Sequence, residues 1–111
     1  MELLFSYGTL QNKKVQLETY GRKLVGDADR ILGFKLERVE ITDDDVLSKS
    51  NEKHHPIAIP TGSSSNFIDG FVYKISNKEL QATDYYEVDN YKRIKAKLES
   101  GKTCWIYIEN K

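Results

Sequence analysis

The chain has 111 residues with 17 basic and 17 acidic side chains, so its formal net charge at pH 7 is zero. This balance excludes the net basic face that nucleic-acid binding requires, and no apolar run approaches the ~20 residues of a membrane-spanning helix. A chain of this length builds a single core, so we expect one domain over residues 1–111.

The N-terminal sequence and the cysteine content both favour a cytoplasmic protein. Met1-Glu2 lacks the basic start of a signal peptide, and the apolar run at 3–5 is too short for its hydrophobic segment. Cys104 is the only cysteine, so the chain cannot form an internal disulfide. Because Cys104 stands beside Trp105 in an apolar stretch, we expect a small core residue rather than a nucleophile.

Strand patterns account for most of the chain. Runs of apolar, aromatic and β-branched residues, several of them alternating with polar ones, predict strands. Gly33 within the second run indicates a bulge or close packing. Prolines on both sides confine the third run to a sheet edge or a strand end. The expected strands cover residues 3–7, 30–39, 57–59, 67–75, 94–98 and 103–108, and a hairpin turn at 99–102 joins the last two.

Two short helices are expected between the strands. The first covers residues 12–20 and stops before Gly21. The second follows Ser76 and runs to about Tyr86, because Ser76 and Glu79 have the spacing of a capping box. Residues 39–55 are acidic and polar, and they predict a long, mobile loop. Together these elements indicate an α+β protein with a small mixed barrel.

The loop after the first strand has features that suit anion binding. Leu3-Leu4-Phe5 leads directly into the segment 6–10, Ser-Tyr-Gly-Thr-Leu. Gly8 can adopt a positive φ and lets a ligand approach the main chain closely. Backbone N–H groups presented in this way bind a carboxylate or an oxyanion. A plain turn is the alternative, because many junctions between a strand and a turn contain a glycine.

Glu87 is the candidate acid–base residue. On the expected second helix, Leu80, Asp84 and Glu87 have the i, i+4, i+7 spacing of one face. If Leu80 points to the core, Glu87 points to the interior at the C-terminal end of the helix. Burial and the negative pole of the helix both raise the pKa of such a carboxyl group, which suits a general base. The alternative is an exposed Glu87, or one paired with Lys92 or Arg93.

Other polar clusters give weaker indications of chemistry. The histidine pair at 54–55 has no acidic or cysteine partner at the spacing of a metal site. The serine run at 63–65 lacks the glycines of a nucleophile elbow, and no EF-hand pattern follows the aspartates at 43–45. We therefore expect no metal and no cofactor. Three tyrosines flank the loop and the candidate carboxyl group: Tyr7, Tyr86 and Tyr91.

Taken together, these motifs resemble the γ-glutamylcyclotransferase-like family, in the branch of plant avirulence-induced proteins and γ-glutamylamine cyclotransferases. The matching segments occur in the family's order along the whole chain. They are Tyr7-Gly8-Thr9-Leu10, Gly26, Gly33-Phe34-Lys35-Leu36, Pro56-Ile57-Ala58-Ile59-Pro60, Asp69-Gly70-Phe71-Val72-Tyr73, Asp84-Tyr85-Tyr86-Glu87 with Tyr91-Lys92-Arg93, and Trp105-Ile106-Tyr107-Ile108.

The resemblance implies a fold and a site. The fold is a six- or seven-stranded mixed β-barrel with short flanking helices. Glu87 matches the family's catalytic acid/base residue. The implied substrate-binding residues are Tyr7, Gly8, Thr9 and Leu10, with Tyr91 near the same pocket.

The implied reaction needs few catalytic groups. The α-amine of a γ-glutamyl compound attacks its own γ-carbonyl, closing the ring of 5-oxoproline and releasing an amine. Holding this substrate folded supplies proximity, so no serine, cysteine or metal is required. A base must move one proton, a role for Glu87, and N–H donors must hold the substrate's negative charge, a role for the 7–10 loop. The expected partner is a small γ-glutamyl compound.

A non-catalytic barrel is the alternative, with a small anionic metabolite or a protein partner in the same pocket. An inward Glu87 would repel an anionic ligand, so this residue favours the enzyme. The sequence specifies neither the γ-glutamyl compound nor the oligomeric state.

Overall fold

The computed structural model describes residues 1–40, 54–87 and 90–110, and of residues 39–40 and 54–55 it describes the backbone alone. Seven strands and two α-helices follow one another along this part of the chain. In order they are β1 (Glu2–Ser6), the 3₁₀ turn η1 (Thr9–Gln11), α1 (Lys13–Tyr20), β2 (Gly26–Leu32), β3 (Phe34–Glu40), β4 (His54–Pro60), β5 (Phe67–Ile75), α3 (Asn77–Tyr86), β6 (Tyr91–Lys97) and β7 (Thr103–Glu109).

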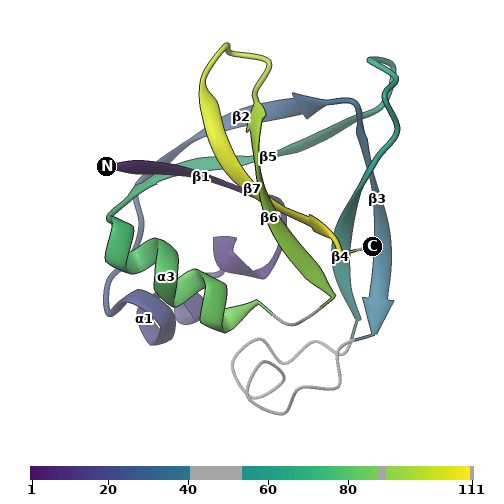
Figure 1. Ribbon diagram of the computed structural model, residues 1–111. Helices are drawn as coiled ribbons and strands as arrows, with labels where there is room; N and C mark the ends of the chain where they lie inside the picture. The colour runs from purple at the N-terminus through teal and green to yellow at the C-terminus, as the bar shows by residue number, and fades with distance from the viewer. Residues whose placement is uncertain (41–53, 88–89, 111) are drawn as a thin grey trace.

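The strands form a five-stranded mixed sheet and a separate hairpin (Figure 1). The order in the large sheet is β2-β5-β1-β7-β6, in which β1 runs antiparallel to β5 and parallel to β7. Strands β3 and β4 pair only with each other in the described part. An α+β fold is therefore confirmed, but the large sheet is not closed, so the expected barrel is not confirmed.

The two edges of the large sheet meet at one point. The turn between β6 and β7 reaches β2, where the N–H of Glu99 donates to the carbonyl of Arg30 at 2.7 Å. Beside this bond, the Ser100 hydroxyl donates to the Asp29 carboxylate at 2.5 Å. The sheet thus curls until the hairpin tip touches the opposite edge, without pairing along the strands.

The single strand expected at 30–39 is wrong. Gly33 has a φ of +85° and lies between β2 and β3, which belong to different sheets. Its N–H donates to Asn66, and its carbonyl accepts from Thr61. Glycine therefore makes a corner here rather than a bulge, because most side chains avoid a positive φ. The expected loop at 39–55 falls largely outside the described residues.

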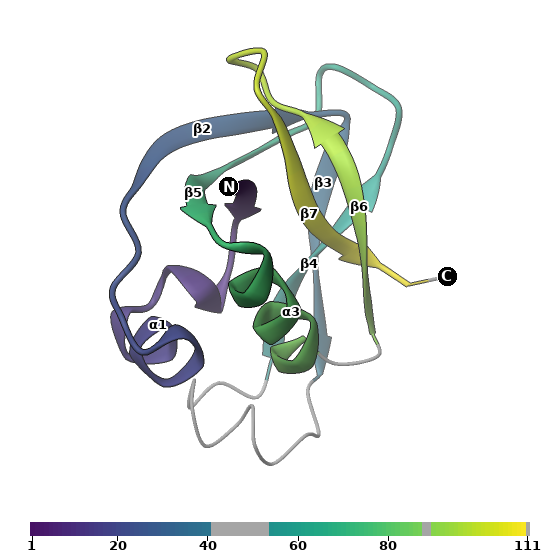
Figure 2. The same cartoon turned by 60° about the vertical axis from the view of Figure 1, so that its left-hand side comes forward.

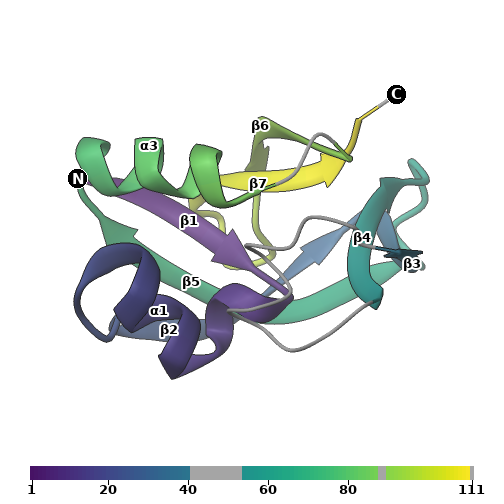
Figure 3. The ribbon, with the colours of Figure 1, turned by 90° about the horizontal axis from the view of Figure 1, so that it is seen from below.

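Both helices end as the sequence predicts, and they pack side by side next to β1 and β5 (Figures 2 and 3). The Asn12 side chain caps α1 by accepting from the Lys14 N–H, and Gly21 ends it with a φ of +73°. The capping box of α3 is present, with Ser76 and Glu79 bonded reciprocally. Glu79 also binds Arg22 of the α1–β2 connection through two hydrogen bonds of 2.7 and 2.9 Å.

Two hydrophobic clusters lie on the two faces of the large sheet. The cluster on the helix side includes Leu4, Val15 and Leu80, and the other includes Phe5, Ile68 and Ile106. Cys104 belongs to the second cluster, where burial raises the pKa of its thiol to about 11. The prediction of a core cysteine is therefore confirmed. None of the helices in the described residues has the length and apolarity to cross a membrane.

Close packing at Gly70 fixes the end of β1. A Cβ atom at this position would lie in hard contact with the Ser6 carbonyl oxygen and 2.7 Å from Cζ of Phe5. Only glycine allows β5 to pass this close to the strand that leads into the 7–10 loop.

We expect Gly70→Ala to destabilise the protein by about 1–3 kcal/mol, because the added methyl group forces β1 and β5 apart. Urea unfolding followed by circular dichroism measures this change. Lys74→Ala removes an exposed side chain from the same strand, and its effect should stay within about 0.5 kcal/mol. Equal effects of the two substitutions would contradict this account of the packing.

Candidate active site

The 7–10 loop connects β1 to η1 and is held from several sides. The Tyr7 hydroxyl donates to the Tyr107 carbonyl and accepts from the Ala58 N–H at 3.1 Å. The Gln11 side chain donates to the Ser6 carbonyl at 2.6 Å. The loop is therefore fixed to β4 and β7, the strands that face it.

Gly8 differs from the expectation of a positive φ. Its φ is −139° and its ψ is −140°, so its conformation is not left-handed. Its role is to allow close approach, because a Cβ atom here would lie 3.2 Å from the Pro56 ring. The missing side chain lets β4 close over the loop.

Two backbone N–H groups of the loop belong to the first residues of η1. The Gln11 N–H closes this turn on the Gly8 carbonyl at 3.1 Å. The N–H groups of Thr9 and Leu10 precede the first bond of the turn, so they have no acceptor within it. Such groups suit an anionic ligand.

Glu87 is the C-terminal capping residue of α3, and its N–H donates to the Thr83 carbonyl at 3.0 Å. The residue as a whole is partly exposed, but its carboxyl group lies in the interior. Burial raises the pKa of this carboxyl group to about 8, and the negative charge of Asp84 adds to the shift. Across the described residues, no donor or cation contacts it.

Asp84 does not share the buried face with Glu87, contrary to the expected spacing. The buried residues of α3 are Leu80, Thr83 and Tyr86. Asp84 is exposed by 40 % and forms a two-bond ion pair with Arg93, at 2.8 and 2.9 Å. The alternative in which Arg93 neutralises Glu87 is therefore wrong, because Asp84 holds that cation instead.

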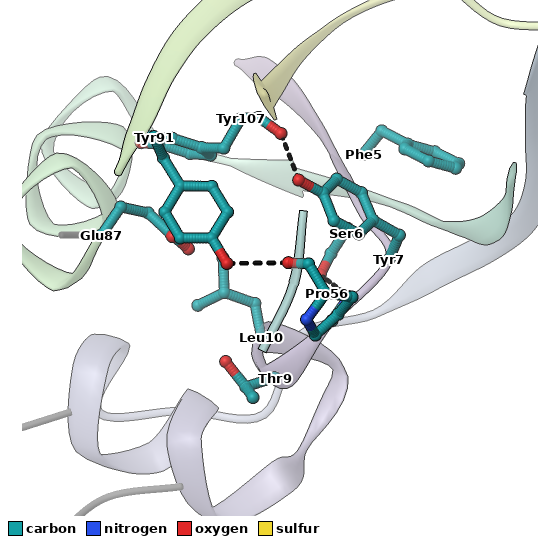
Figure 4. A pocket seen from close by; sticks show the side chains of 10 residues that line it. Phe5, Ser6, Tyr7, Thr9, Leu10, Pro56, Glu87, Tyr91 and Tyr107 are labelled. Atoms are coloured by element: carbon teal, nitrogen blue, oxygen red, sulfur yellow. Dashed lines mark hydrogen bonds between the residues drawn. The ribbon is translucent and has the colours of Figure 1, made fainter. Parts of the chain in front are cut away.

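The loop and Glu87 line one pocket (Figure 4). Its cavity of about 30 Å³ has room for about two water molecules. The lining residues are Phe5, Ser6, Tyr7, Gly8, Thr9, Leu10, Pro56, Glu87, Tyr91 and Tyr107. The structure thus brings together all six residues expected at the site: Tyr7, Gly8, Thr9, Leu10, Glu87 and Tyr91.

Tyrosine hydroxyls surround the carboxyl group but bind elsewhere. Tyr91 donates to the Pro56 carbonyl at 2.7 Å, across the pocket. Burial raises the pKa of Tyr7, Tyr91 and Tyr107, and the charge of Glu87 adds to each shift. These phenols therefore stay neutral and keep their protons near neutral pH.

Tyr107 and Pro56 are pocket residues that the local sequence pattern did not single out. Tyr107 lies on β7, a central strand whose residues 106–108 are all buried, so alternation gives no sign of which face holds the site. The sequence predicts Pro56 as the boundary of a strand and as part of a segment that matches the family, and gives it no place in the pocket. Tyr107 and Pro56 reach the pocket because β7 and β4 run beside the 7–10 loop. This arrangement depends on the whole fold and not on neighbouring residues in the sequence.

No group of three or more histidine, cysteine, aspartate or glutamate side chains in the described part of the chain is arranged to hold a metal ion. The side chains of the histidine pair at 54–55 and the aspartates at 43–45 lie outside the described residues.

The sequence matches one family model over almost its whole length. This model, described as gamma-glutamyl cyclotransferase, AIG2-like, covers residues 4–111. None of the curated proteins compared with the chain matches its sequence.

Solved structures share the fold at low sequence identity. One named gamma-glutamyl cyclotransferase has a TM-score of 0.74 at 20 % identity, over 98 % of this chain and 66 % of its own. An uncharacterized protein from Homo sapiens gives 0.72 at 20 %, over 99 % and 67 %. One from Pyrococcus horikoshii gives 0.68 at 18 %, over 100 % and 80 %. These likenesses concern the fold, and the chain spans about two thirds to four fifths of these proteins' lengths.

The raised pKa of Glu87 makes a prediction about stability. Because folding raises this pKa from 4.5 to about 8, the protonated carboxyl group is favourable at low pH, and this contribution is lost as the pH rises through 8. Glu87→Gln should therefore stabilise the protein relative to wild type at pH 9, on the order of a few kcal/mol, and not at pH 4.

Thermal unfolding across this pH range measures the difference. Glu79→Gln on the same helix is the matched control, because its effect on stability should have the opposite sign. Arg22 holds the pKa of Glu79 at about 2, so this variant should lose stability at neutral pH, and its deficit should shrink as the pH falls towards 2. A Glu87→Gln effect that does not change with pH would contradict the buried carboxyl group.

Proposed function

The chain belongs to the AIG2-like gamma-glutamyl cyclotransferase family, and we propose that it is an enzyme that converts a γ-glutamyl compound into 5-oxoproline and a free amine. One observation carries this proposal. An interior carboxyl group, with no counter-ion among the described residues, lines the same pocket as a loop whose Thr9 and Leu10 N–H groups have no acceptor within the 3₁₀ turn. These are the two elements that an intramolecular cyclisation requires.

The loop would hold the negative charge of the substrate. The N–H groups of Thr9 and Leu10 lack acceptors within η1, and charge-assisted hydrogen bonds to a carboxylate are stronger than neutral ones. The neutral phenols of Tyr7 and Tyr91 donate to the Tyr107 and Pro56 carbonyls, so neither offers a free proton in this arrangement. Among its described lining residues the pocket has no lysine or arginine, so binding relies on hydrogen bonds rather than on an ion pair.

Glu87 would move the proton. Its carboxylate accepts a proton from the substrate's α-ammonium, and the free amine then attacks the γ-carbonyl carbon. As the bond to the leaving nitrogen breaks, the protonated Glu87 returns the proton to that nitrogen. The regenerated carboxylate accepts the second proton, which the ring nitrogen loses to become the lactam N–H, and passes it to the released amine, which leaves as an ammonium ion. A pKa near 8 suits both steps, because a group that titrates close to ambient pH accepts and donates protons with little cost.

Folding the substrate accounts for much of the expected rate. The reacting amine and carbonyl belong to one molecule, so a pocket that holds both ends fixes them at attack distance. A γ-glutamyl group is larger than two water molecules, so its entry widens the present cavity. The hydrogen bond from Tyr91 to the Pro56 carbonyl crosses this space, and its opening would free one donor and one acceptor for the substrate.

We expect purified protein to release 5-oxoproline from at least one member of a panel of γ-glutamyl amines and γ-glutamyl dipeptides. Glu87→Gln should reduce this rate about 10²-fold or more, since the amide has no proton-accepting carboxylate. Chromatographic detection of 5-oxoproline measures the product, and circular dichroism checks the fold of the variant.

Glu18→Gln is the control, because it replaces an exposed carboxylate on α1 and should leave the rate unchanged. No product from the whole panel at high protein concentration would count against the enzyme and favour a pocket that only binds a metabolite. A Glu87→Gln variant with wild-type turnover would contradict the role of this residue.

A further inference from the structure

Five ionisable side chains from five parts of the fold interact with the Glu87 carboxyl group in the described part of the chain. They are Tyr7 after β1, Tyr20 of α1, Asp84 of α3, Tyr91 of β6 and Tyr107 of β7. Each of the four tyrosines carries a hydroxyl proton that a carboxylate could accept. None of them gives it to Glu87, so each must have another acceptor.

Three of these hydroxyls are engaged by groups with no charge. Tyr7 donates to the Tyr107 carbonyl and Tyr91 to the Pro56 carbonyl. Tyr20 bonds the Thr83 hydroxyl at 2.6 Å. Because the Thr83 hydroxyl gives its own proton to the Glu79 carbonyl at 2.9 Å, the Tyr20 hydroxyl is the donor in this pair.

The fourth hydroxyl and the Arg93 guanidinium share one acceptor, Asp84. Tyr107 donates to Oδ1 of Asp84 at 2.6 Å. Arg93 donates through Nε to Oδ1 and through Nη2 to Oδ2, at 2.8 and 2.9 Å. Asp84 therefore accepts three hydrogen bonds that charge makes strong.

Asp84 stands three residues before Glu87, so the two carboxyl groups lie about one helical turn apart. The Arg93 side chain is 24 % exposed, and its guanidinium lies over the Trp105 ring, 4.2 Å from the centroid. If Asp84 lost its charge, Arg93 would lose this partner, and Glu87 would be the other carboxyl group at this end of α3.

We propose that Asp84 is a positioning residue, which binds Arg93 and Tyr107 and so leaves the neighbouring carboxylate of Glu87 unpaired. Its catalytic meaning rests on the proposed function, because an unpaired carboxylate is what a general base requires. The arrangement itself does not depend on turnover. Asp84 acts on Glu87 in two ways: its negative charge repels the Glu87 carboxylate, and its ion pair keeps Arg93 away from that carboxylate. Both effects favour the protonated form of Glu87 and so keep its proton available for transfer.

Titration of the ¹³Cδ resonance of Glu87 tests this proposal without any substrate. Uniformly ¹³C-labelled glutamate supplies the signal, and Glu87→Gln assigns it. Asp84→Asn should lower the Glu87 pKa by at least one unit, a tenfold change in the ionised fraction at a given pH. The neutral amide of Asn still accepts the hydrogen bond from Tyr107. The change in the Glu87 pKa therefore comes from the lost negative charge and from the release of Arg93.

The double variant Asp84→Asn/Arg93→Gln separates these contributions. With the cation also removed, the pKa should return to at least half a unit above that of Asp84→Asn. Lys92→Gln is the matched control, because it removes an exposed cation from the adjacent position of β6, and it should leave the pKa unchanged. An unchanged pKa in Asp84→Asn, or a double variant as low as the single one, would overturn the proposal.

Arg93→Gln alone keeps the test decisive if Asp84→Asn fails to fold. This variant leaves an unpaired Asp84 charge one turn from Glu87, so the Glu87 pKa should rise, and a fall or no change would overturn the proposal. In an active protein, the acid limb of the pH profile of kcat/KM should move with the titrated pKa. An inactive protein whose pKa values still shift as stated would contradict the proposed function alone.

Discussion

The site depends on keeping one carboxyl group in the interior without a counter-ion. Transfer of a carboxylate from water to a protein interior is unfavourable, and here no cation or donor in the described residues offsets it at Glu87. The group responds by retaining its proton up to a pKa of about 8. Because solvent exposure would be more favourable for this side chain, the rest of α3 must hold Glu87 in its interior position. The capping box, Arg22 and the buried Leu80 provide this hold.

The sheet order explains how residues about eighty positions apart form one pocket. Strand β1 lies in the middle of the large sheet, between β5 and β7, so the loop that follows it emerges beside the end of α3 and the pocket face of β7. The bond between Thr9 and Tyr86, at 2.6 Å, ties the loop to the last turn of that helix. Gly70 lets β5 pack against Ser6, the last residue of β1. This contact fixes the position at which the 7–10 loop leaves the sheet.

Local patterns in the sequence predicted much of this structure but not the contacts between distant elements. Capping at Ser76 and the stop at Gly21 depend on neighbouring residues alone, so both helices were found. At Gly33 the sequence predicts a bulge or close packing within one strand, because a glycine in an apolar run gives no sign of whether the chain continues in the same sheet. Spacing predicts Asp84 on the buried face, because it gives no sign of the ion pair with Arg93 that this exposed carboxylate forms. The six site residues came from the resemblance to a family together with the spacing of Glu87, and the pocket brings all of them together.

The central claim is that Glu87 and the 7–10 loop act on one molecule, and a structure with 5-oxoproline bound tests it most directly. The account predicts the product in the pocket, with its carboxylate within hydrogen-bond distance of the Thr9 or Leu10 N–H and its ring nitrogen within the same distance of the Glu87 carboxyl group. Product bound elsewhere, or bound with its ring nitrogen turned away from Glu87, would contradict the account.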